Sequence, residues 1–79
     1  MSHVPHELAE EFPEYSTKMH ELKMSDPHFA HRFDEYHNVN RQVHRSETNV
    51  EPVSDDVMVD LRKRRMTLKD EIYAILRDA

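Results

Sequence analysis

Histidine supplies the most direct argument for chemistry in this chain, which has seven histidines and no cysteine. His28 and His31 stand one helical turn apart, and Asp34 or Glu35 could add a carboxylate to a zinc-type site. However, the sequence has no HExxH pattern, and both histidines fall on the outward side of the helix predicted there. We therefore interpret them as solvated surface residues and predict no metal site and no cofactor.

The only basic run consists of Arg62, Lys63, Arg64 and Arg65. Such a run could contact a phosphate or an acidic partner, but it is also typical of a helix surface neutralised by nearby acids such as Glu47 and Asp60. No aromatic stacking platform accompanies the run, and the net charge of −5 repels phosphate backbones. The sequence therefore disfavours nucleic acid as a partner.

No pattern of catalytic residues stands out among the acids and histidines. A nucleophile beside a base, or two carboxylates in a pocket, would need a concave site that excludes water. A thin helical chain without glycine offers little concavity of that kind. We predict that the protein is not an enzyme.

Composition favours one small helical protein. A chain of 79 residues allows a single domain. The absence of glycine argues against short β-sheets with tight turns and against phosphate-binding loops, because both commonly need glycine. The absence of cysteine suits a reducing compartment. No basic flank followed by an apolar run begins the chain, and no stretch approaches the roughly 18 apolar residues of a membrane span. We expect a cytoplasmic protein that does not enter a membrane.

Three helices are predicted, over about 13–24, 27–47 and 55–77, within a single helical domain of residues 13–79. Pro13 interrupts the apolar rhythm that begins at Leu8, so residues 1–12 are expected to be flexible or frayed, with a short or frayed turn over 6–11. Asp26 followed by Pro27 is a typical helix start, with a side-chain cap and a ring already set for helical geometry. Ser54 before two aspartates is a second helix start.

The two long helices are expected to form an antiparallel hairpin with a coiled-coil-like contact. The turn is predicted over 48–53, and a connection near Pro52 makes facing residue numbers sum to about 104. Tyr36 would then face Leu68, and Asn40 would face Arg65. A single polar layer of this kind specifies register, as a buried asparagine does in coiled coils. The alternative is that both side chains reach solvent at the edge without meeting.

A hairpin of this size buries too little apolar surface to be stable alone. The last helix carries an apolar strip beside its main contact face, formed by Val59, Met66, Tyr73 and Leu76. We predict that this strip is covered, either by the N-terminal helix through Tyr15, Met19 and Leu22 or by a second copy of the chain. Docking within the chain is the first choice, because the short tether keeps the N-terminal helix at high effective concentration.

The segments FAHRFDEYHNVNRQVHR and LRKRRMTLKDEIYAIL resemble the YdcH-like family of short, mostly proteobacterial proteins. The most specific motifs are FDEYH (Phe33 to His37) and LKDEIY (Leu68 to Tyr73), and the resemblance extends over almost the whole chain. Val39, Val43 and Met66 are smaller or more flexible than the residues the pattern leads us to expect. The resemblance implies a helical hairpin and carries no established activity or catalytic residue.

Two functional hypotheses follow. The first is a non-enzymatic module that binds an unidentified protein partner or associates with itself as a homodimer. The apolar strip on the last helix supports it, because such a surface is commonly buried against another protein. The alternative is a nucleic-acid- or anion-responsive regulator that uses the basic run. Salt-dependent binding to duplex DNA or RNA would discriminate between them.

Overall fold

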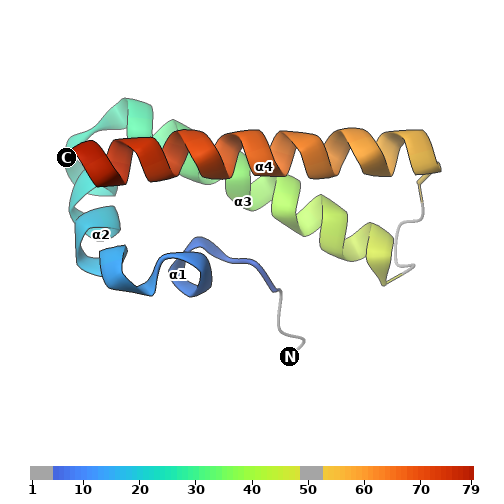
Figure 1. The fold of residues 1–79 in the computed structure, drawn as a ribbon, viewed down its shortest axis with the longest axis horizontal. Helices are drawn as coiled ribbons and strands as arrows, with labels where there is room; N and C mark the ends of the chain where they lie inside the picture. The colour runs from blue at the N-terminus through green and yellow to red at the C-terminus, as the bar shows by residue number, and fades with distance from the viewer. Residues whose placement is uncertain (1–4, 49–52) are drawn as a thin grey trace.

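The computed structural model describes residues 5–48 and 53–79, and every regular element in them is a helix. In chain order these are α1 (Leu8–Glu11), the short 3-10 helix η1 (Pro13–Tyr15), α2 (Ser16–Ser25), α3 (Pro27–Glu47) and α4 (Asp55–Asp78). The long helices α3 and α4 pack against each other and run in opposite directions (Figure 1). This confirms the predicted all-α hairpin with a shorter N-terminal helix.

Local chemistry places the starts of both long helices. The Asp26 carboxylate accepts hydrogen bonds from the backbone N–H groups of His28 at 3.0 Å and Phe29 at 3.3 Å. The Ser54 hydroxyl accepts from the Val57 N–H at 3.3 Å. Each cap satisfies N–H groups that have no partner within the helix. The turn predicted over 48–53 falls mainly on residues 49–52, which lie outside the described residues.

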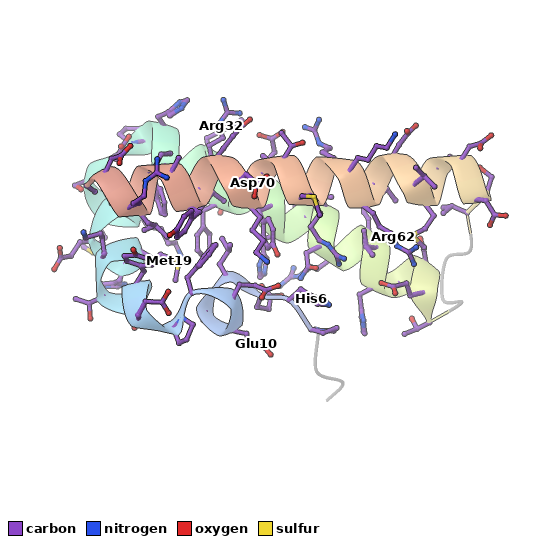
Figure 2. All side chains as sticks on the ribbon, viewed as in Figure 1. His6, Glu10, Met19, Arg32, Arg62 and Asp70 are labelled. Carbon is purple, nitrogen blue, oxygen red and sulfur yellow. The ribbon has the colours of Figure 1, made fainter. Side chains whose placement is uncertain are left out.

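The core lies between the hairpin and the N-terminal helices. Phe29 and Tyr36 of α3 and Ile72 of α4 are fully buried in it. The N-terminal part of the chain contributes Leu8, Phe12 and Met19, and Met19 reaches from α2 toward the hairpin (Figure 2). Contacts between residues far apart in sequence therefore complete a core that the hairpin alone would leave open on one side.

The N-terminal segment is packed against the hairpin. A short or frayed turn was expected over residues 6–11; Leu8–Glu11 form a helical turn, and the Leu8 side chain is only 1% exposed. The helix expected over 13–24 is divided at Ser16 into η1 and α2. Burial of Leu8 and Phe12 against the hairpin stabilises this short turn. Its backbone hydrogen bonds alone would not keep so short a helix folded.

No helix among the described residues is long and apolar enough to cross a membrane.

Candidate functional site

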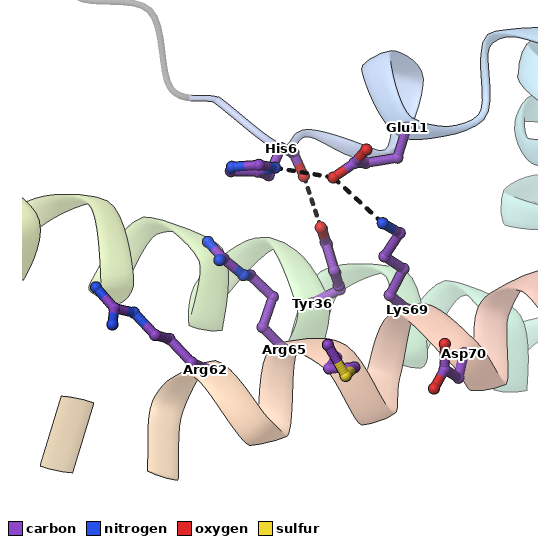
Figure 3. A pocket seen from close by; sticks show the side chains of 8 residues that line it. His6, Glu11, Tyr36, Arg62, Arg65, Lys69 and Asp70 are labelled. Carbon is purple, nitrogen blue, oxygen red and sulfur yellow. Dashed lines mark hydrogen bonds and ion pairs between the residues drawn. The ribbon is translucent and has the colours of Figure 1, made fainter. Parts of the chain in front are cut away.

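The N-terminal segment, α3 and α4 meet around an open groove of about 540 Å³ (Figure 3). Most of the residues that line it carry a polar or charged group. The residues that line it are His6, Glu11, Tyr36, Arg62, Arg65, Met66, Lys69 and Asp70. It brings part of the predicted basic run beside one residue of the predicted apolar strip.

Two hydrogen bonds from α3 hold the N-terminal segment at one edge of this groove. The Tyr36 hydroxyl donates to the carbonyl oxygen of His6 at 2.6 Å, and the Asn40 amide donates to the carbonyl oxygen of Pro5 at 2.9 Å. Tyr36 and Asn40 are one helical turn apart, so from the same face of α3 they donate hydrogen bonds to two neighbouring carbonyl groups. His6 has φ of 65°, the left-handed region, which a non-glycine residue adopts at an energetic cost.

Asn40 and Arg65, the residues predicted to form a polar layer, are in contact. The Arg65 guanidinium donates to the Asn40 side-chain oxygen at 3.1 Å. Asn40 is almost completely buried, at 1% exposure, so both ends of its amide are used: the oxygen by Arg65 and the nitrogen by Pro5. Sequence reasoning identified the first partner and missed the second, because nothing in the pattern placed Pro5 near α3.

Glu11 is the electrostatic centre of the groove. Its carboxylate lies 2.9 Å from His6 Nδ1 and 3.4 Å from Lys69 Nζ. The hydrogen bond with His6, and after it the charge of Lys69, hold the pKa of Glu11 below its usual range, against an opposing effect of partial burial. These contacts link the N-terminal segment to α4 as well as to α3 (Figure 3).

Tyr36 lies deeper than Glu11. Burial, followed by the negative charge of Glu11, raises the pKa of Tyr36 to about 12. Its hydroxyl therefore stays protonated at neutral pH and acts as a hydrogen-bond donor to His6.

The arginines of the basic run are engaged with α3. Arg62 contacts Glu47 at 3.5 Å, Arg64 pairs with Glu35, and Arg65 contacts Asn40 as described above. Lys63 is exposed and has no ion-pair partner among the described residues. The run is therefore divided between contacts within the hairpin and one outward lysine.

Three of the described histidines, His6, His31 and His37, each contact a carboxylate in a separate pair. His37 Nδ1 lies 2.7 Å from Glu7, and His31 Nδ1 lies 3.7 Å from Glu35. His28 and His31 are both exposed. In residues 5–48 and 53–79, no group of three or more such side chains lies close enough to hold a metal ion.

The apolar strip of α4 is covered at one end. Leu76 is fully buried, and the Tyr73 ring stacks on Phe12 with a centroid separation of 5.5 Å and meets Tyr15 edge-on at 6.3 Å. Tyr73 nevertheless remains 40% exposed. Phe12 was not among the residues predicted to cover the strip, although it continues the same apolar rhythm.

The other half of the strip corrects the prediction of cover within the chain. Val59 is 47% exposed and Met66 is 66% exposed. The N-terminal segment does not reach them, because the residues before α1 turn onto α3, where Tyr36 and Asn40 bind their carbonyls. Docking within one chain therefore accounts for Leu76 and part of Tyr73 only.

Comparison with known proteins shows which family the sequence is similar to. Residues 29–76 match the family described as "Protein of unknown function (DUF465)". The chain is 31% identical over 65 residues to the "Uncharacterized protein YdcH" of Escherichia coli (strain K12), an alignment that covers 82% of this chain and 88% of the relative. The protein of the same description from Shigella flexneri matches to the same extent. No solved structure matches the chain significantly.

Proposed function

The chain belongs to the family of proteins of unknown function DUF465, and we propose that it is a non-enzymatic protein–protein interaction module. Its binding surface in this proposal is the α4 stripe, defined as Val59, Met66 and Tyr73. We place the module in the cytoplasm, since the chain has no cysteine for disulfides and its described helices include no membrane span.

The exposure of the α4 stripe is the observation that carries this proposal. Its members recur every seven residues, so they lie on one face of α4, and each is at least 40% exposed. The other face of α4 is buried through Leu68, Ile72 and Leu76. A row of large apolar side chains left in water on a rigid helix is typical of a surface that another protein covers.

The groove supports a non-enzymatic role. No serine, threonine or cysteine is among the described residues that line it. The Glu11 carboxylate is already paired with His6 and Lys69, and the Tyr36 hydroxyl is committed to a backbone carbonyl. These groups hold the N-terminal segment in place, which is a structural task.

A nucleic-acid- or anion-responsive role for the basic run is the weaker proposal. Arg62, Arg64 and Arg65 each contact an acceptor on α3, so binding a phosphate would require them to exchange those partners. Binding to duplex DNA or RNA that weakens steeply with added salt would favour this alternative. Binding that is undetectable at low salt would dismiss it.

Site-specific crosslinking in the native cell tests the interaction module. A photoreactive amino acid replaces Met66 in one variant and Thr67 in a matched control, which is exposed on a different face of the same helix. We expect discrete adducts from position 66, repeated from position 59, and none from position 67. Adducts of equal yield from all three positions, or no adduct from any, would refute the proposal.

A further inference from the structure

We propose that the partner of the α4 stripe is a second copy of this chain, which docks its own α4 antiparallel with Met66 at the twofold axis. This inference rests on the proposed interaction function and adds to it the identity of the partner and the geometry of the contact.

The stripe is self-complementary in this arrangement. Val59 and Tyr73 lie seven residues on either side of Met66, so an antiparallel α4 pair places Val59 of one copy against Tyr73 of the other. Met66 then packs on Met66 of the second copy. At about 1.5 Å per residue, the three contacts follow about 20 Å of straight helix. A twofold pair also buries the same patch on both chains, as closed homodimers do.

Charge on one flank of the stripe favours this register. Lys63 and Asp70 lie three residues before and four residues after Met66. With about 3.6 residues per turn, both project to the same side of the stripe. Neither has an ion-pair partner in residues 5–48 and 53–79, and both are exposed. In the antiparallel pair, Lys63 of each copy meets Asp70 of the other, so two unpaired charges of opposite sign become two ion pairs.

The other flank does not oppose the pairing. Arg62 of one copy approaches Lys69 of the second, which would repel if both stood alone. Arg62 already has Glu47 at 3.5 Å, and Lys69 already has Glu11 at 3.4 Å. Each cation therefore carries its own counter-charge into the contact, and the local net charge is close to zero.

A parallel pairing of the two helices is less well matched by the same charges. It places each flank of one helix opposite the other flank of its partner, so Lys63 would approach Arg62 of the second copy and Asp70 would approach Lys69. Lys63 would then meet a second cation and gain no carboxylate. Only the antiparallel arrangement pairs Lys63 with Asp70 in both places.

Sedimentation of the purified full chain over a wide concentration series tests self-association. We expect the mass to rise from monomer toward dimer. Met66→Glu should abolish the rise, because it places two carboxylates together on the twofold axis, while Thr67→Glu should leave it unchanged. Circular dichroism should show that both variants keep their helix content. A chain that stays monomeric throughout, or one whose association survives Met66→Glu, would overturn the inference.

Charge reversal tests the register. Lys63→Asp alone and Asp70→Lys alone should each weaken the dimer several-fold, because each leaves two like-charged contacts. An equimolar mixture of the two variants should form a heterodimer at least as readily as the parent chain associates, because both ion pairs are restored. Asp60→Lys, an exposed charge reversal away from the stripe, serves as the control. A mixture that associates no better than the separate variants would overturn the antiparallel register.

Cysteine crosslinking gives a geometric test, since the natural chain has no cysteine. Met66→Cys should form a disulfide-linked dimer under mild oxidation. Val59→Cys should not, because the two copies of position 59 are about 20 Å apart along antiparallel helices. Efficient crosslinking at both positions would indicate a parallel pair and overturn the inference. A monomeric chain that still gives position-specific adducts with a different protein in cells would end the self-association proposal and leave the interaction module standing.

Discussion

The hydroxyl of Tyr36 donates a 2.6 Å hydrogen bond to the carbonyl oxygen of His6, thirty residues earlier in the chain. This contact fastens the N-terminal segment to α3 and fixes the position of Glu11 over α4. It also keeps the carbonyl of a residue with left-handed backbone geometry satisfied. The following predictions test this arrangement and the polar contacts around it.

Tyr36→Phe should lower the free energy of unfolding by about 1 kcal/mol, because it deletes one hydrogen bond while keeping the buried ring. Urea denaturation followed by circular dichroism measures the change. Tyr15→Phe is the matched control, since no hydrogen bond of its hydroxyl is present among the described residues. Equal effects of the two substitutions would show that the bond to His6 contributes nothing to stability.

Stability should fall between about pH 10 and pH 12 because of Tyr36. Its pKa is raised from 10.0 to about 12 in the folded protein, so across this interval the folded chain retains a proton that the unfolded chain has lost. The contribution is complete below pH 10 and is lost as the pH rises through 12. Tyr36→Phe should flatten this part of the stability profile. An unchanged slope in the variant would contradict the assigned burial of the hydroxyl.

Glu11→Gln should destabilise the protein near neutral pH and have no effect in strong acid. The pKa of Glu11 is lowered from 4.5 in the folded state, so its contribution is present above 4.5 and is lost as the pH falls through the lower, folded value. Urea denaturation from about pH 6 to about pH 3 should show the two stability curves converging. Glu14→Gln, which alters an exposed carboxylate, should follow the parent chain throughout. Parallel curves for Glu11→Gln would refute the prediction.

Asn40→Ala should cost about 1–3 kcal/mol, because it removes partners from Arg65 and from the Pro5 carbonyl at a buried position. Asn38→Ala is the control, being the same substitution at an exposed site on the same helix. A double-mutant cycle with Arg65→Ala should give a favourable coupling energy between the two side chains. No coupling would show that their contact is incidental to stability.

Zinc or nickel should leave the melting temperature unchanged beyond the small effect of weak surface binding, because no group of three or more potential ligands gathers among the described residues. Differential scanning calorimetry with and without the metal measures this. A rise of about ten degrees, more than about 1 kcal/mol for a chain of this size, would contradict the prediction. His28→Ala and His31→Ala would then identify the ligands.

The sequence by itself determined the helical hairpin and predicted its polar pairing. Helix starts at Asp26–Pro27 and Ser54 depend on side chains that cap the nearest backbone groups, so local residue order is enough to place them. The meeting of Asn40 with Arg65 follows from helical periodicity counted outward from one short connection. Both inferences use distances along the chain that regular geometry converts directly into distances in space.

Only the tertiary structure decided the path of the N-terminal segment. Pro13 correctly marked a break in the helix, but the burial of Leu8 depends on an open face of the hairpin that no local pattern describes. The positions of Pro5 and His6 depend on hydrogen bonds from residues at least thirty positions away. Because that segment turns onto α3, Leu76 is covered while Met66 stays in water, and four residues that look alike in sequence acquire different environments.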